Sequence, residues 1–294
     1  MTTQRCRDRD RPVVPTPHDD GSAQGDGSGH GAGSGHGAGD ELPPAATSLD
    51  ELPTLAPEAP LRFACHPGLA CFNACCADLD LVLGPYDVLR LRTALGLDSA
   101  AFDAAYAVAE CFPGNGFPYR RLRMRDVEGS PCPFVRAAGC AVYADRPAAC
   151  RSYPLGRAAR VAAAGGIEAR LVVVREPHCQ GFDEGRVRSA TSWLDDQGLA
   201  PYQAMSDRYL ELMTRSASVL GPLTSKQARL VDLGTYQLDR FVDFADAVEL
   251  LERLGVAERF RAAIRDDPDS CLAFALDWLE ATLLHDRARL AAWR

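Results

Sequence analysis

Four thiols lie within the twelve residues CHPGLACFNACC, which run from Cys65 to Cys76. The spacing is Cys-x5-Cys-x3-Cys-Cys, so that Cys75 and Cys76 are adjacent. Thiolates are ligands for zinc and for iron–sulfur clusters, and each such site commonly takes four of them. This run therefore indicates a metal site, and it supplies four of the ligands that such a site needs.

A second group of thiols follows further along the chain, at Cys132, Cys140, Cys150 and Cys179. Eight thiolates are the number required by two four-thiolate sites, built either around zinc or around iron–sulfur clusters. The close N-terminal run is more typical of iron–sulfur proteins than of a zinc ribbon, which shows two separated Cys-x2-Cys pairs. Zinc stays open. The predicted metal ligands are Cys65, Cys71, Cys75, Cys76, Cys132, Cys140, Cys150 and Cys179.

The adjacent pair suggests how the ligands divide. In an extended backbone, successive side chains point to opposite faces. Cys75 and Cys76 are therefore expected to face two different metal sites and to hold the two centres close together.

Three cysteines are left out of this set. Cys6 lies in a polar tail, Cys271 lies on the apolar face of a predicted helix, and Cys111 has no ligand-type residue near it in sequence. His66 or His178 could replace one thiolate. Either could also pair with its neighbouring cysteine as a nucleophile, but adjacent residues are poorly placed to act as nucleophile and base. The catalytic residues stay unknown.

Composition divides the chain into three predicted parts. Residues 1–60 form a disordered tail rich in Gly, Ser, His and Pro, residues 61–190 a cysteine-cluster domain, and residues 191–294 a helical region packed on it. The net charge is −8, and 31 of the 32 basic residues are arginine without a clustered stripe, which disfavours nucleic-acid binding. No apolar run reaches the length of a membrane span, and no secretory signal is recognised at the N-terminus. We therefore expect a cytoplasmic location, where cysteines more often bind metal than form disulfides.

Local patterns predict an α+β fold with short hairpins. Helices are expected over 85–95, where Pro85 begins and Gly96 ends the apolar stripe, and over about 100–110. Residues 119–124 read as a strand, and residues 132–143 and 160–174 as hairpins, the second turning at Gly165–Gly166. A short helical turn is expected over 144–154. Helical periodicity marks the C-terminal part, whose last helix begins with Asp267 and Pro268.

The quoted cysteine run, joined to CPFVRAAGCAVYADRPAACRSYP and a later HCQGF, resembles the CxxCxxCC (YkgJ-type) cysteine-cluster family of zinc- or iron-chelating proteins. The resemblance covers about residues 63–182. The gaps between the first cysteines are five and three residues here, whereas the family name implies two and two. The second motif matches closely, at Cys140, Tyr143, Arg146, Pro147, Cys150, Arg151, Tyr153 and Pro154.

Three functions follow from these observations. The first is a protein that holds iron–sulfur clusters and serves electron transfer, cluster handling or a cluster-assisted modification, together with an unknown protein or redox partner. The second is a structural zinc module that supports protein interaction. The third is implied by the resemblance alone: a protein-lysine N-methyltransferase of the flagellin-methylase type, which would need S-adenosylmethionine. No G-x-G-x-x-G motif follows a predicted strand, so the sequence itself gives this third function no support.

Overall fold

The computed structural model describes residue 50 and residues 54–294. The predicted tail, residues 1–60, lies outside the described residues except for Asp50 and 54–60, and Cys6 lies outside them too. Residues 54–60 contact the body of the protein. The backbone N–H of Leu55 donates to the carbonyl of Leu171 at 2.7 Å, and the first strand, β1 (Pro60–Arg62), begins at Pro60.

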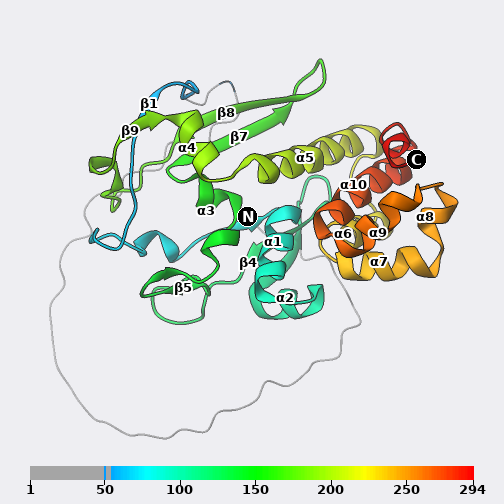
Figure 1. Ribbon diagram of the computed structural model, residues 1–294, viewed down its shortest axis with the longest axis horizontal. Coiled ribbons are helices and arrows are strands. Elements are labelled where there is room, and N and C mark those ends of the chain that lie inside the picture. The colour runs from blue at the N-terminus through cyan, green and yellow to red at the C-terminus, as the bar shows by residue number, and fades with distance from the viewer. Residues whose placement is uncertain (1–49, 51–53) are drawn as a thin grey trace, which may run out of the picture.

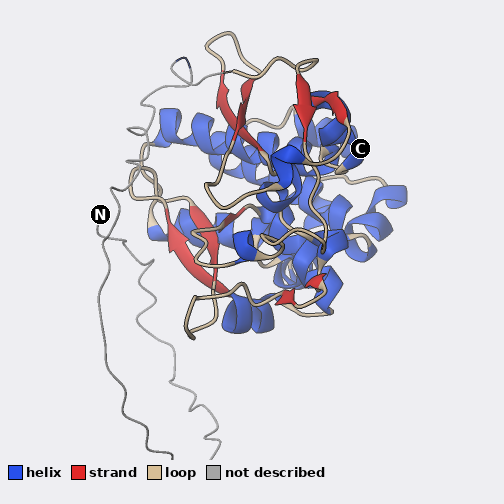
Figure 2. Cartoon of the chain, turned by 90° about the vertical axis from the view of Figure 1, so that its left-hand side faces the viewer, coloured by secondary structure: helices blue, strands red, loops and turns tan. Residues whose placement is uncertain are grey.

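The fold mixes helices with small sheets (Figure 1). In that view, short strands and loops occupy the left-hand part, and the helices that follow residue 200 gather on the right. Figure 2 shows the strands as short separate pieces beside the helices. Among the described residues, no helix is long and apolar enough to cross a membrane.

A three-stranded antiparallel sheet lies beside the first two helices. Its strand order is β2 (Val82–Leu83), β4 (Pro118–Leu122) and β3 (Ala107–Cys111). Helix α1 (Pro85–Leu95) is confirmed, with Pro85 in its first turn and Gly96 ending it in the left-handed conformation at φ 64°. Helix α2 (Ser99–Tyr106) begins after Asp98, whose carboxylate caps it by accepting the Ala101 N–H at 2.7 Å.

The predicted helix over about 100–110 is wrong in its second half. Ala107–Cys111 form strand β3 and pair along their whole length with β4, from Ala107 opposite Leu122 to Cys111 opposite Pro118. The alanine-rich sequence is compatible with a helix, but pairing with a neighbouring strand overrides this local preference.

Two hairpins and one helical turn are confirmed. Strands β5 (Val135–Arg136) and β6 (Gly139–Cys140) form the first hairpin, and β7 (Leu155–Val161) and β8 (Ile167–Val173) form the second, which turns through Gly165 and Gly166 at positive φ. Between the hairpins lies the short helix α3 (Ala148–Ser152). Strand β9 (Val187–Ser189) pairs with β1, and helix α4 (Ala190–Asp196) follows it.

The C-terminal part is helical, as predicted. Its last helix begins with Asp267, whose carboxylate accepts the Ser270 N–H at 3.0 Å, and Pro268 occupies the first turn. Cys271 is 3% exposed within this helix and packs in the core, as expected. The helices are α5 (Ala200–Leu220), α6 (Ser225–Thr235), α7 (Leu238–Ala247), α8 (Leu250–Arg253), α9 (Glu258–Asp266) and α10 (Pro268–Leu284).

The strand-rich part and the C-terminal helices meet in an apolar core. Tyr86 of α1 packs edge-on against Tyr202 of α5, with ring centroids 4.9 Å apart, and Phe117 beside β4 joins the cluster built around α5 and α10. Helix α1 contributes Val88 and Leu91 to a second cluster, with the three-stranded sheet and α2. Helix α1 therefore belongs to both cores and fixes the strand-rich part against the helices.

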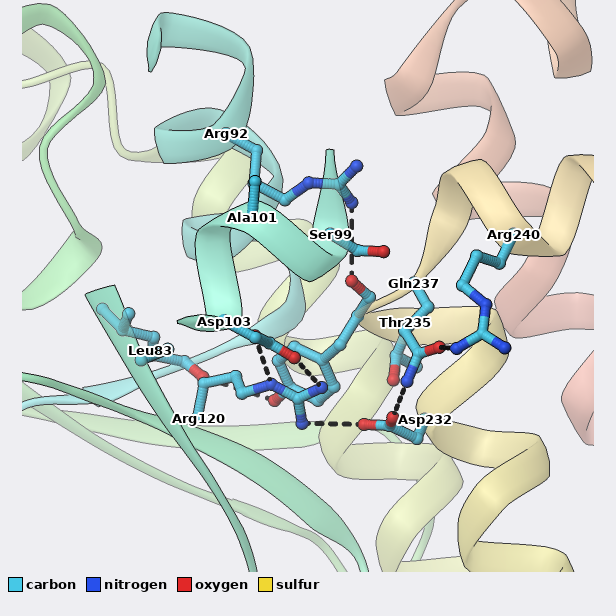
Figure 3. A network of polar contacts seen from close by, with 12 residues as sticks. Leu83, Arg92, Ser99, Ala101, Asp103, Arg120, Asp232, Thr235, Gln237 and Arg240 are labelled. Atoms are coloured by element: carbon cyan, nitrogen blue, oxygen red, sulfur yellow. Dashed lines mark hydrogen bonds and ion pairs between the residues drawn. The ribbon is translucent and has the colours of Figure 1, made fainter. Parts of the chain in front are cut away.

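A buried arginine reinforces this junction (Figure 3). Arg120 of β4 is 1% exposed and donates two hydrogen bonds to Asp103 of α2, at 2.9 and 2.8 Å. It donates a third to Asp232 of α6 at 2.7 Å, and its guanidinium lies 4.6 Å from the centroid of the Tyr236 ring. One cation thus joins a strand and a helix of the strand-rich part to a helix of the C-terminal part.

Candidate metal centre

The eight predicted ligands carry free thiols, and neighbouring thiols affect one another's pKa in two sets that overlap at Cys75. Burial raises the pKa of the Cys65 thiol, and three neighbouring thiols raise it further, those of Cys75, Cys71 and Cys179. Because such an effect requires proximity, these four cysteines form one group. We call it group A: Cys65, Cys71, Cys75 and Cys179.

The other four cysteines are related in the same way. Neighbouring protein atoms desolvate the Cys150 thiol and raise its pKa although the residue is exposed, and the thiols of Cys132, Cys140 and Cys75 add to this effect. A hydrogen bond with Cys75 and desolvation raise the pKa of Cys76, and the thiols of Cys132 and Cys150 raise it further. We call this set group B: Cys76, Cys132, Cys140 and Cys150.

Group A joins two segments that are far apart in sequence. The Ala64 N–H donates to the Gly181 carbonyl at 3.0 Å, which places the turn carrying Cys179 beside the residue that precedes Cys65. A Cβ at Gly181 would lie 2.5 Å from Cε2 of Phe63 and 2.6 Å from the Ala64 oxygen, so only glycine allows this approach. Gly181 therefore allows the turn that carries Cys179 to approach the backbone at Phe63 and Ala64 closely.

Group A also has a backbone donor. The Gln180 N–H donates to the sulfur of Cys71 at 3.3 Å. Hydrogen bonds from backbone N–H groups to ligand sulfur stabilise thiolate charge in metal sites. Gln180 could not have been found from the sequence, because the interaction uses no side chain.

Group B is assembled on the first hairpin and on helix α3. Cys140 lies in β6 opposite Val135, and Cys150 lies in α3. Cys132 precedes Val135, the first of the paired residues of the hairpin, and so does not lie at the end of a strand. Its backbone N–H donates instead to the carbonyl of Cys76 at 2.8 Å, which ties the hairpin directly to the first cysteine run.

The adjacent pair corrects one premise of the sequence analysis. Cys75 and Cys76 lie in a 3₁₀ turn, η2 (Ala74–Cys76), and not in extended backbone. Successive side chains of a 3₁₀ helix are about 120° apart, because each turn holds about three residues. The alternation of faces expected from extended backbone therefore does not apply to this pair. Their thiols remain in contact through a hydrogen bond that lowers the pKa of Cys75 to about 6 and raises that of Cys76.

Asn73 sets the direction of this turn, and the sequence analysis did not single it out. Its backbone adopts the left-handed conformation at φ 70°, which asparagine tolerates better than most residues. Its side-chain amide donates to the Arg136 carbonyl in the hairpin turn at 2.9 Å. An asparagine immediately before a short turn is the signal that could have identified it.

Residues 64–180 match the model of the CxxCxxCC family, which is described as "Putative zinc- or iron-chelating domain". We refer to this matched segment as the CxxCxxCC domain. All eight thiols of groups A and B lie inside it. No curated protein and no solved structure matches the chain.

The donor chemistry of the CxxCxxCC domain fits a thiolate-bound metal or cluster. Each group offers four thiols, group A has the N–H donor to Cys71, and N–H groups of Phe134 and Val135 oppose the effect of burial on the pKa of Cys132. Within residues 50 and 54–294, however, no three His, Cys, Asp or Glu side chains already lie close enough together to hold one ion. Each group is a gathering of neighbouring thiols and not a finished coordination sphere.

A positive charge accompanies group B. Arg146 of the CxxCxxCC domain is 8% exposed, and its guanidinium lies near the thiols of Cys150 and Cys140. It donates to the carbonyl of Tyr143 and to the side chain of Gln197, so its position is fixed from both sides. Such a group offsets part of the negative charge of several thiolates.

His66, His178 and Cys111 are the other residues whose side chains could bind a metal. Nδ1 of His66 accepts the Gly68 N–H at 3.2 Å, which occupies one ring nitrogen. His178 lies near enough to Cys75 to favour its thiolate form. Cys111 ends strand β3 and belongs to neither group.

Proposed function

We propose that the protein is a metal-binding protein whose CxxCxxCC domain holds two thiolate-bound centres, one in group A and one in group B. The contacts between distant segments support this proposal: the Gln180 N–H, next to Cys179, donates to the Cys71 sulfur at 3.3 Å, and the Cys132 N–H donates to the carbonyl of Cys76 at 2.8 Å. Four thiolates are a complete ligand set for a tetrahedral zinc ion or for a four-iron cluster.

We propose iron–sulfur clusters as the occupants. The close run from Cys65 to Cys76 supports this choice, because it is more typical of iron–sulfur proteins than the separated Cys-x2-Cys pairs of a zinc ribbon. When bound, a cluster supplies one-electron transfer, and a protein redox partner in a reducing cytoplasm would exchange the electron.

Zinc is the second candidate, because the apolar core next to group A is small. The buried residues of this core are five: Leu61, Phe63, Leu155, Ala190 and Trp193. A small core gains stability from a structural metal, and zinc commonly has this role. In this case the protein would use its metal for folding and would carry no redox function.

Metal and sulfide analysis of the protein purified without oxygen separates the two candidates. We expect iron and acid-labile sulfide in similar amounts and an absorption band near 400 nm, at about the position that thiolate-bound clusters show. A colourless protein with two zinc ions per chain would refute the clusters and support the zinc module. A protein without metal, when purified from cells supplied with iron and zinc, would refute both.

Cysteine variants test the division into groups. Cys65→Ser should remove the centre of group A and leave that of group B, so that the metal content falls by about half. Cys150→Ser should do the reverse. Cys271→Ala is the matched control, because this thiol is buried in α10 away from both groups, and it should leave the metal content unchanged. Full metal content in Cys65→Ser or in Cys150→Ser would contradict the assignment of that residue.

A further inference from the structure

A cavity lies between helix α5 and the hairpin of strands β7 and β8. Helix α5 runs beside β7, and helices α1 and α3 also line the space (Figure 1). The cavity has a volume of about 670 Å³, within the range of about 300–1,000 Å³ that small-molecule sites occupy. Ala149 and Ser152 of α3 line it, so the cavity lies against the same short helix that carries Cys150.

Most side chains around this cavity are apolar or aromatic. Leu155 and Leu171 line it from the hairpin, and Leu210 lines it from α5. Tyrosine rings join them, including those of Tyr86 in α1 and Tyr209 in α5. Aromatic side chains favour edge-on or offset contact with another ring. The cavity is therefore suited to a flat, mainly apolar ring compound.

Asp87 and Arg157 are the charged side chains of the described lining, and both are engaged within the protein. The Asp87 carboxylate accepts the Gly84 N–H at 2.9 Å and the Ala148 N–H at 2.8 Å. The Arg157 guanidinium donates to both carboxylate oxygens of Asp207, at 2.8 and 2.9 Å. Because burying an unpaired charge is unfavourable and no free counter-charge lines this space, the cavity favours an uncharged ligand.

Tyr202 of α5 keeps a free hydrogen-bond donor in the lining. Its side chain is buried, with the residue 4% exposed. The Arg151 guanidinium lies over its ring, 4.6 Å from the centroid, and opposes the rise in the pKa of Tyr202 that burial causes. Arginine can only donate hydrogen bonds, so Arg151 offers no acceptor for the phenolic proton, and no other described residue does. A buried donor without an acceptor is unfavourable, which indicates an acceptor supplied by a ligand.

We propose that this cavity binds an uncharged aromatic compound whose carbonyl oxygen accepts a hydrogen bond from Tyr202. This inference goes beyond the proposed metal binding and does not depend on it. The apolar lining binds the ring through burial of its surface. The Tyr202 hydroxyl selects a carbonyl compound over a hydrocarbon of the same shape, because the hydrocarbon leaves the buried donor unpaired.

Equilibrium dialysis of the full-length protein tests the cavity with two probes, 2-acetylnaphthalene and 2-ethylnaphthalene, which share a ring system and differ in the carbonyl oxygen. We expect one molecule of 2-acetylnaphthalene per chain, with a Kd below about 1 mM for a ligand of this size. Tyr202→Phe should weaken its binding about 3–10-fold, the contribution of one neutral hydrogen bond. The same variant should bind 2-ethylnaphthalene as tightly as the wild type or more tightly. An equal loss for both probes would show a purely structural role and overturn the assignment of Tyr202.

Ser206→Trp tests the location by filling the space. Ser206 is exposed and lines the cavity, whereas Ala204 is exposed two residues earlier in the same helix and lies outside the lining. We expect Ser206→Trp to abolish the binding of both probes and Ala204→Trp, the matched control, to keep it, with circular dichroism showing that both variants fold. Full binding in Ser206→Trp, or no binding of 2-acetylnaphthalene to the wild type, would overturn the proposal. Metal content measured on the same samples keeps this test separate from the proposed function, since a loss of probe binding alone leaves metal binding standing.

Discussion

Replacing Arg120 by methionine tests the junction between the strand-rich part and the helices. The guanidinium makes three hydrogen bonds of 2.7–2.9 Å, two to Asp103 and one to Asp232, from a position that is 1% exposed. Its pKa is raised, because the attraction of these carboxylates outweighs the effect of burial. The variant would keep much of the apolar volume but leave two carboxylates without their cation.

The expected loss follows from the burial of these groups. Removing one partner of a buried ion pair lowers the free energy of unfolding by about 3–5 kcal/mol, mostly because the remaining charge is uncompensated. The side chains of Asp103 and Asp232 are 19% and 20% exposed, so water relieves part of this penalty. We therefore expect about 3 kcal/mol for Arg120→Met.

This loss is measured by urea unfolding of the metal-loaded protein, with circular dichroism as the signal. Arg265→Met is the control, since Arg265 is 35% exposed and pairs with Asp246 and Glu252, which are 46% and 41% exposed. Exposed pairs contribute about 0–1 kcal/mol, so the control should change little. Equal losses in the two variants would refute the reasoning. The triple variant Arg120→Met, Asp103→Leu, Asp232→Leu leaves no uncompensated charge, so it should be more stable than Arg120→Met. Equal stability of the two would also refute the reasoning.

Three other predictions concern the strand-rich part. Gly181→Ala should lower the free energy of unfolding by about 1–3 kcal/mol and reduce metal content at group A, because its Cβ would collide with Phe63. Gly114→Ala is the control, because nothing lies within 4 Å of its Cβ, and it should change neither quantity. Urea unfolding and metal analysis measure both variants. Burial raises the pKa of Asp87 above its ordinary value of 3.8, so the folded protein keeps this proton at a pH where the unfolded chain has lost it. The free energy of unfolding should therefore fall as the pH rises from about 3.8 through the raised pKa, and Asp87→Asn should show a smaller fall in urea unfolding across this range; an identical pH dependence would contradict the assignment. Asp98→Ala should lower the free energy of unfolding by about 1 kcal/mol through loss of the α2 cap, and an unchanged urea midpoint would show that the cap contributes nothing.

Local signals account for the elements that were predicted well. Pro85 and Gly96 bound α1, Asp267 and Pro268 begin α10, and Gly165–Gly166 turn the second hairpin, because each of these residues limits the backbone wherever it occurs. The assignment of Cys271 to the core of α10 followed from the same helical period.

The errors came from features that depend on distant parts of the chain. Ala107–Cys111 became a strand because β4 lies beside it, and no local residue reports that neighbour. The 3₁₀ turn at Cys75 and Cys76 depends on the bond from Asn73 to the hairpin at Arg136. The grouping of the eight thiols likewise depends on contacts such as that between Cys132 and Cys76. The sequence shows how many thiols the chain carries, but it does not show which of them lie together in space.

The four cysteines up to the turn at Cys75 and Cys76 are synthesised before the other four predicted ligands. Cys65, Cys71, Cys75 and Cys76 are all synthesised about 100 residues before Cys179, which corresponds to about 5–20 s of translation. During this interval the four thiols have only one another as ligands, so an ion captured early would be held by members of both later groups. We expect a peptide of residues 61–80 to bind one ion with all four thiols. Folding then brings the later hairpin against this run, where the Cys132 N–H donates to the carbonyl of Cys76 at 2.8 Å.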